Sequence, residues 1–251
     1  MRAVIRYGLG FLVLALLWQA GSVLMGEALL PDVPSTLWAF VEACQQASFW
    51  DAVAVSSVRL TVGLFTAMGV AFPLGLLMGH CPKADRLLSP LLFITFPIPK
   101  IVLLPVFFTL VGLGDASRIL LIGLTVGYQM LVIIRDDALN LDPAYIKSFR
   151  SMGGTGCQAI WHVYLPAALP SLFTSLKVAA GTAMAVLFLA ESFATTSGLG
   201  YLIMDAWGLG DVLSMFVAIL GMSGLGLALY GGISLVERVL CPWSVREKRK
   251  N

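Results

Sequence analysis

Residues Val212 to Val236 read VLSMFVAILGMSGLGLALYGGISLV, without one charged side chain. A helix needs about 20 consecutive apolar residues to cross a bilayer, so this stretch is long enough for one transmembrane helix. The whole chain agrees: of 251 residues, 59% are hydrophobic and 12% are charged, with a mean hydropathy of +0.90. Soluble domains carry about 25% charged residues. The composition excludes an ordinary cytosolic enzyme, a disordered chain and a nucleic-acid binder with a basic face, and it predicts an integral membrane protein.

Other apolar stretches predict five more spans, in one membrane domain covering residues 1–251. The first, Tyr7–Gly26, is longer than the apolar core of a signal peptide, so we expect it to be retained. Leu37, Phe40, Val41 and Cys44 then recur at helical spacing and predict an amphipathic helix on the outer surface. The remaining spans are expected at Ser56–Gly79, Leu87–Leu113, Ser117–Ile134 and Ala168–Ala194, with a glycine-rich outer loop at Thr195–Asp211.

The positions of Lys and Arg predict the orientation. All but four of the sixteen Lys and Arg residues lie on one side of the predicted spans, and the four are Arg59, Lys100, Arg118 and Lys177. Cytoplasmic loops carry an excess of Lys and Arg. Both termini, including a basic tail at 238–251, are therefore expected in the cytoplasm, and Arg118 is expected in an outer turn.

The third predicted span contains Pro90, Pro97, Pro99 and Pro105, with Lys100 near its middle. Proline removes a backbone donor and clashes with the preceding turn. In lipid, the freed carbonyl groups must be satisfied by neighbours or by water. We therefore expect this helix to be bent and to pack inside the protein instead of against lipid.

The longest polar segment is 135–165. Apolar residues recur at helical spacing on both sides of Gly153 and Gly154, and the segment ends in Leu165-Pro166. Two short helices joined at glycines and presented to the cytoplasm would form a docking surface for another protein. A solvated loop between two spans is the alternative.

This segment resembles a known signature. Gly153, nine further residues and then Val163-Tyr164-Leu165-Pro166 resemble the EAA motif of the permease subunits of bacterial ABC importers. Phe96-Pro97-Ile98-Pro99-Lys100, Leu165–Pro170 and Ser197–Ile203 resemble, in the same order, segments of the nitrate/sulfonate/taurine-type permeases. The resemblance covers nearly the whole chain. It implies that the following residues couple the chain to an ATPase: Lys147, Ser148, Phe149, Arg150, Met152, Gly153, Gly154, His162, Leu165 and Pro166.

One part of the motif departs from the family. Lys147, Ser148 and Phe149 stand where the motif has Glu-Ala-Ala, so a base replaces an acid. In the family, this helix lies in a cleft of the ATPase subunit. A reversed charge disfavours a generic ATPase surface and favours one with a complementary acidic residue.

Four charged residues are predicted within the membrane: Arg59, Lys100, Lys177 and Glu191. A charge at bilayer depth is costly, so such residues are candidates for a translocation pathway. Structural explanations differ: Arg59 and Glu191 could pair with each other, and Lys177 could extend to the cytoplasmic face. Lys100 has the weakest structural explanation, because it is central and surrounded by prolines. If the solute is an anion, Lys100 and Arg59 could balance its charge.

The resemblance implies an all-α permease with six transmembrane helices in the MetI-like architecture of type I importers, in the bacterial inner membrane. It also implies a homodimer that works with two cytoplasmic ATPase subunits and an extracytoplasmic solute-binding protein. The expected solutes are small oxyanions such as a sulfonate, taurine or nitrate.

The chain lacks a phosphate-binding G-x-x-x-x-G-K-[ST] motif and a hydrolase motif. We therefore expect no enzymatic activity, no cofactor or metal in this chain, and no nucleic-acid partner, with ATP and Mg bound by the ATPase. An ion-coupled secondary transporter and a structural membrane subunit of a larger complex are the alternatives.

Overall fold

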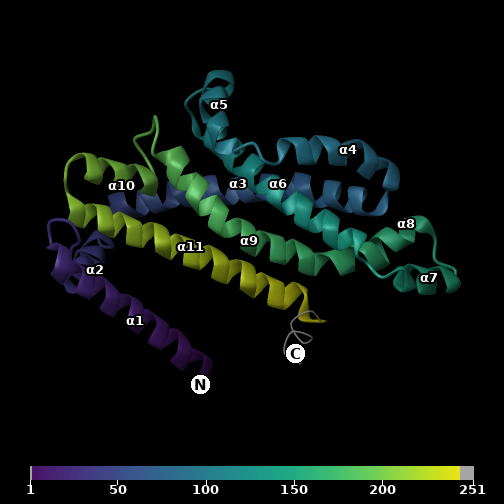
Figure 1. Ribbon diagram of the computed structural model, residues 1–251, viewed down its shortest axis with the longest axis horizontal. Coiled ribbons are helices and arrows are strands. Elements are labelled where there is room, and N and C mark those ends of the chain that lie inside the picture. The colour runs from purple at the N-terminus through teal and green to yellow at the C-terminus, as the bar shows by residue number, and fades with distance from the viewer. Residues whose placement is uncertain (1, 244–251) are drawn as a thin grey trace. The chain divides into compact units, whose positions relative to one another are not determined.

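The computed structural model describes residues 2–243, without the side chains of residues 2–7, 156 and 157, so most of the predicted basic tail lies outside the described residues. Within this range, every regular element is a helix (Figure 1). The elements are α1 (Arg2–Met25), α2 (Val33–Ala43), α3 (Ala47–His80), α4 (Pro82–Thr95), η1 (Lys100–Leu103), α5 (Leu104–Val111), α6 (Asp115–Leu139), α7 (Pro143–Ser151), α8 (Gly156–Ala159), η2 (Ile160–Tyr164), α9 (Leu165–Glu191), α10 (Leu199–Gly208) and α11 (Val212–Leu240).

Five helical stretches are long and apolar enough to cross a membrane: α1, α3, α6, η2 with α9, and α11. The pair formed by α4 and η1–α5 passes the same test when taken together and is bent by 84°. The described residues thus offer five spans, or the six predicted ones if the bent pair crosses as one. The bend expected from the prolines of the third span is confirmed.

The chain divides into two compact units. Unit 1 comprises Met1–Ser56 and Glu191–Leu225, and unit 2 comprises Ser57–Ala190 and Gly226–Asn251. In unit 1, Phe49, Ala52 and Leu199 form a small core. The predicted amphipathic helix is present as α2, and Phe40 on it meets Phe49 edge to face, with ring centroids 5.8 Å apart. Aromatic pairs favour this arrangement.

In unit 2, α3 and α6 pack closely through glycines. A Cβ atom at Gly63 would lie 2.7 Å from the Ile122 side chain, and one at Gly75 would lie 2.8 Å from Ile134. Both isoleucines are fully buried. Small residues allow the backbones of membrane helices to approach in this way, so these glycines serve ordinary helix packing.

Two expectations are corrected. The predicted glycine-rich loop at Thr195–Asp211 contains a helix, α10, because Leu199, Ile203 and Ala206 form a buried apolar face on it. The bent third span does not pack inside a single chain, since Leu87, Ile94 and Leu110 on it are exposed. Its broken backbone is instead stabilised locally, by Lys100.

Candidate functional site

The predicted coupling segment folds as two short helical pieces joined by glycines. Residues 135–139 still belong to α6, so the segment itself begins with α7. Asp142 caps α7 by accepting a hydrogen bond from the Ala144 N–H at 2.8 Å, and Pro143 occupies the first turn. Short polar side chains at this position satisfy the free backbone donors of a helix start. The helical patterning read from the sequence is thereby confirmed.

The glycine joint has a specific geometry. Gly153 has φ +86°, which an L side chain rarely adopts. Gly154 lies against the Phe149 ring so closely that a Cβ atom there would overlap the ring. The Gly154 N–H donates to the Phe149 carbonyl at 3.2 Å. The two glycines therefore let the chain turn tightly at the end of α7.

The second helical piece packs back on the first. Thr155 and Gln158 form a reciprocal capping box at the start of α8. The ring of His162 on η2 stacks on that of Phe149, with centroids 6.1 Å apart and planes 18° apart. Behind them, Tyr164 lies against His80 of α3 at 3.6 Å between ring centroids. The coupling segment is thus tied to the end of a transmembrane helix.

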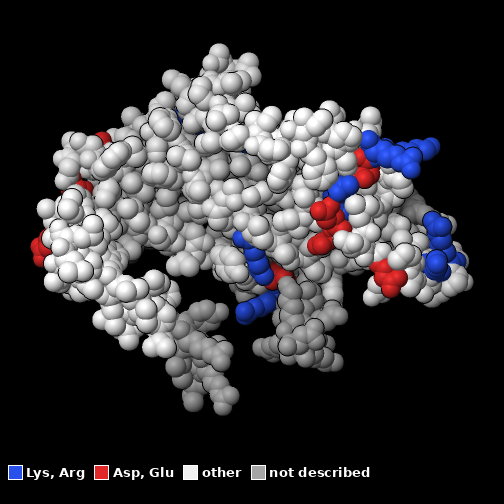
Figure 2. Space-filling view, in the orientation of Figure 1, with Lys and Arg blue, Asp and Glu red and all other residues white. Residues whose placement is uncertain are grey.

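The predicted coupling residues differ in exposure. Phe149 and Gly154 are partly buried in the joint, and Leu165 and Pro166 begin α9. Met152 is 78% exposed. The others are also exposed: Lys147, Ser148, Arg150, Gly153 and His162. Figure 2 shows Lys and Arg side chains over α7 and the start of α4. The exposed members are available to a partner, and their role in coupling remains a prediction.

Lys100 lies at the break of the third span. Its ammonium donates to the carbonyls of Thr95 and Phe96, at 2.7 Å each, and lies 4.2 Å from the centroid of the Tyr128 ring. Thr95 is the last residue of α4, and its usual helical donor four residues later would be Pro99, which has no N–H. The Ile98 N–H also donates to the Thr95 carbonyl, at 3.2 Å, so Lys100 adds a second donor there and a donor to Phe96, and its charge suits a helix C-terminus. Sequence reasoning offered it as a pathway residue, whereas its described contacts are structural.

Two more of the predicted pathway residues form ion pairs within unit 2. Arg59 on α3 bonds the carboxylate of Asp115, with Nη2 2.6 Å from Oδ1. Lys177 on α9 pairs with Glu237 on α11. Glu237 is buried and Lys177 is partly buried. A paired charge is the usual form of an ionisable group at membrane depth, so the structure satisfies both cations without a solute.

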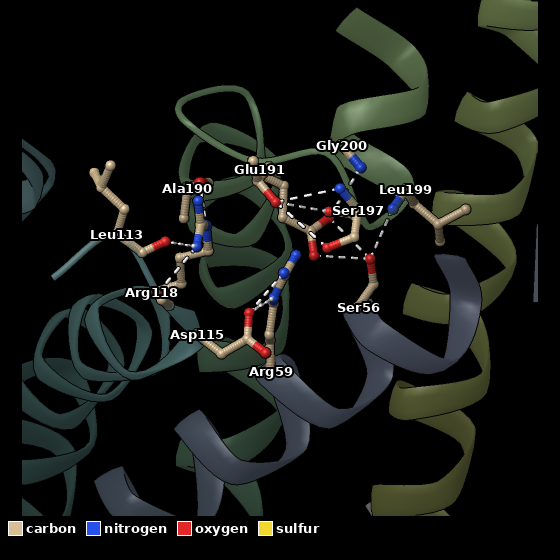
Figure 3. A network of polar contacts seen from close by, with 12 residues as sticks. Ser56, Arg59, Leu113, Asp115, Arg118, Ala190, Glu191, Ser197, Leu199 and Gly200 are labelled. Carbon is tan, nitrogen blue, oxygen red and sulfur yellow. Dashed lines mark hydrogen bonds and ion pairs between the residues drawn. The ribbon is translucent and has the colours of Figure 1, made fainter. Parts of the chain in front are cut away.

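Arg118 is the residue that sequence reasoning placed wrongly. It was expected in an outer turn, but it lies in the first turn of α6 and is 1% exposed. Its guanidinium donates to the carbonyls of Leu113, Gly114 and Ala190, at 2.9 to 3.1 Å (Figure 3). Arg118 lies four residues after Gly114, at the start of an apolar run. This position in the sequence could have indicated that its side chain is buried.

In unit 1, the buried side chains of Glu191 and Ser56 bind the backbone N–H groups of Leu199 and Gly200, and these four residues are called the Glu191 clasp below. Glu191 is 1% exposed. Its carboxylate accepts hydrogen bonds from Ser56 Oγ at 2.8 and 2.9 Å and from the Gly200 N–H at 2.9 Å (Figure 3). Ser56 Oγ in turn accepts from the Leu199 N–H at 2.8 Å. The acid and the serine together bind the free N–H groups at the start of α10, where a negative charge is favourable.

Gly198 completes this clasp. Its backbone, with φ 105° and ψ 165°, lies in a region that is essentially restricted to glycine. A Cβ atom at Gly198 would overlap the Glu191 carboxylate. The Ser-Gly-Leu-Gly sequence at 197–200 thus has a physical reason: it lets the backbone wrap closely around a buried acid.

A family model described as "binding-protein-dependent transport system inner membrane component" matches residues 71–240. The chain belongs to this family of ABC transporter permeases. It is 30% identical over 200 residues to the taurine transport system permease protein TauC of Escherichia coli, covering 78% of this chain and 72% of TauC. It is 26% identical to the putative aliphatic sulfonates transport permease protein SsuC of Bacillus subtilis, over 92% and 84% of the two chains.

Two further likenesses extend this result. The formylaminopyrimidine transport permease protein ThiX of Halalkalibacterium halodurans is 25% identical over 94% of this chain and 95% of ThiX. A chain of the MetNI methionine ABC transporter, in an inward-facing conformation, superposes with a TM-score of 0.64 at 20% identity, over 75% of this permease and 94% of that chain. The predicted fold and family are confirmed.

Membership places this permease in the inner membrane and assigns its partners. Such permeases interact with ATPase subunits and with a solute-binding protein. ATP hydrolysis belongs to the separate ATPase, which binds the nucleotide. Within the described part of this permease, no group of three or more His, Cys, Asp or Glu side chains could hold a metal ion.

Proposed function

We propose that this permease imports small sulfonates, with taurine the leading candidate. The observation that carries the proposal is the 30% identity to the taurine permease TauC over 78% of this chain. The likeness to the sulfonate permease SsuC supports the same class.

The proposed permease works as a homodimer by alternating access. The ATPase pair moves α7, and the stacked rings of Phe149 and His162 carry this motion into η2 and α9. Differential binding of nucleotide to two states of the ATPase supplies the free energy. Weak and transient contacts with the solute suffice, because a tight site would retain it.

The coupling helix selects its ATPase by charge. Lys147 and Arg150 are exposed on α7, and Arg150 lies in its last turn. An ATPase cleft with an acidic side chain attracts the basic surface of α7. A cleft with a basic side chain, which would suit the acid of the usual motif, repels it. The ATPase that serves this permease therefore presents a carboxylate opposite Lys147.

A second candidate solute comes from a different relative. ThiX aligns over more of both chains than TauC does, although at a lower identity. The solute in the name of ThiX, a formylaminopyrimidine, is not a sulfonate. This candidate is included in the test.

The experiment is uptake into liposomes that hold the complete importer: permease, its ATPase and its solute-binding protein. Labelled taurine, an alkanesulfonate and formylaminopyrimidine are compared with and without internal ATP. We expect ATP-dependent accumulation of taurine or the alkanesulfonate. Accumulation of formylaminopyrimidine alone would replace the proposed class, and uptake that persists without ATP but collapses with an ion gradient would indicate secondary transport.

A further inference from the structure

In the part of unit 1 that follows α1, every charged side chain is acidic. Its residues after Met25 contain no Lys, Arg or His, and Figure 2 shows acidic side chains on the part of this unit around α2 and α10. Its carboxylates belong to Glu27, Asp32, Glu42, Asp51, Glu191, Asp205 and Asp211. All but Asp32 and Glu191 are exposed. The surface of this unit therefore has one sign of charge and attracts cations.

A groove of about 310 Å³ lies in this surface, lined by α10 and by the starts of α3 and α11. Its floor is apolar, because Phe49, Ala206, Val217 and Ala218 are buried there. Its rim is polar and consists of Gln46, Ser48, Asp205, Asp211 and Ser214. An apolar floor with a charged rim suits a long side chain that has a charged end.

The two carboxylates on the rim differ in their surroundings. Asp211 accepts a hydrogen bond from the Ser214 N–H at 3.0 Å, which caps α11. The Ser214 hydroxyl and then this N–H lower the pKa of the Asp211 carboxyl. Asp211 is therefore ionised at neutral pH. Within the described part of the chain, the Asp205 carboxylate has no hydrogen-bond or ion-pair partner. Its charge is free to meet a cation from outside the chain.

The negative charge on the rim of the groove determines which kind of partner can bind there. A second copy of this chain would bring the same carboxylates, and an anionic lipid surface would also be repelled. Leu209, which also lines the groove, is 77% exposed, and Trp207, two residues before it, is 64% exposed. Aromatic residues together with arginine are enriched at protein interfaces. We infer that the groove receives a Lys or Arg side chain of the solute-binding protein, held between Asp205 and Asp211.

This inference rests on the family membership and on the predicted orientation, which places residues 26–56 outside the cytoplasm. It is independent of the proposed solute, because docking can be measured with the binding protein alone. The orientation has its own check. A Trp207→Cys variant of a cysteine-free permease should react with a membrane-impermeant maleimide in intact spheroplasts.

The docking experiment uses the complete permease–ATPase complex in nanodiscs and the fluorescently labelled binding protein. The dissociation constant is measured for Asp205→Lys and Asp205→Asn over a range of salt concentrations. The matched control is Asp51→Lys, which makes the same charge change on an exposed residue of the same unit outside the groove. We expect Asp205→Lys to weaken docking about tenfold, Asp205→Asn less, and Asp51→Lys least.

Three results would overturn the inference. Equal weakening by Asp205→Lys and Asp51→Lys would show a general effect of net charge without a site. Unchanged affinity in both Asp205 variants would show that the groove does not meet the binding protein. Unchanged docking with loss of a zwitterionic lipid from the complex, detected by native mass spectrometry, would assign the groove to a lipid headgroup.

Discussion

The ammonium of Lys100 caps the carbonyls at the break of the third span, together with the Ile98 N–H, which also donates to Thr95. An unsatisfied buried polar group costs about 1–3 kcal/mol, and Lys100 serves both Thr95 and Phe96. Its stacking over Tyr128 adds a cation–π contact that ties the break to α6. The FPIPK sequence at 96–100 is therefore a unit: the prolines interrupt the helix and the lysine repairs the interruption.

Lys100→Met should accordingly destabilise the protein by about 1–3 kcal/mol and lower its unfolding temperature in detergent. Lys83→Met is the matched control, because Lys83 is an exposed lysine at the start of α4. Thermal unfolding is measured alongside uptake kinetics. A variant at 100 with normal stability and an altered KM for the solute would instead make Lys100 a pathway residue.

The close contact between Gly198 and Glu191 can be tested by substitution. Gly198→Ala should cost about 1–3 kcal/mol of backbone strain and should also displace the Glu191 carboxylate, which detaches the start of α10. Gly26→Ala is the control, since Gly26 has φ +84° with open space around its Cβ position. Hydrogen exchange of the Leu199 and Gly200 amides measures the effect. Unchanged protection of these amides in Gly198→Ala would contradict the clasp.

At the scale of elements, α7 and η2 are connected by the glycine joint at Gly153-Gly154 and by the stacked rings of Phe149 and His162. Gly153 and Gly112 share a positive φ and open space at the Cβ position, so valine strains both backbones similarly. Gly153→Val should reorient α7 and abolish uptake and its coupling to ATP hydrolysis, while membrane insertion stays normal. Gly112→Val is the control for strain alone. Normal transport by Gly153→Val would remove the coupling role from this segment.

Whether a segment forms a span, a bend or a short helix could be predicted from the sequence where a single physical effect dominates. Uncharged runs such as Val212–Val236 had to be spans, the prolines had to bend the third span, and Gly153-Gly154 had to separate two helical pieces. The helix α10 was missed because its glycines favoured a loop, although Leu199, Ile203 and Ala206 recur at helical spacing. The contacts of Ser56 and Glu191 with its first N–H groups are long-range and leave no local pattern.

The same limit applies to the candidate pathway. A sequence shows that a charge lies at membrane depth, but not which group neutralises it. Arg59 and Lys177 each pair with a carboxylate, and Lys100 donates to carbonyls beside the prolines that interrupt the helix. Arg118 was assigned to the wrong environment for the same reason, because its carbonyl partners include Ala190, far along the chain.

At the scale of the whole molecule, the exposed bend requires a partner. Residues 96–99, between α4 and η1, are irregular and exposed. Irregular backbone at membrane depth is not tolerated against lipid and occurs only where protein or a water-filled cavity covers it. The expectation that this span lies inside the protein is therefore met only if another protein or a water-filled cavity covers it. A second copy of the chain is one such cover, and the homodimer remains a proposal.

A homodimer should bring the two bends close to each other. In a cysteine-free background, Ile98→Cys should form a disulfide between two copies in membranes treated with a mild oxidant, because exposed Ile98 lies in the bend. Leu14→Cys, on the exposed face of α1, is the control and should stay monomeric. Native mass spectrometry of the purified importer should find two permease copies with two ATPase subunits. A single copy, or a different permease chain in the second position, would mean that another protein covers the bend.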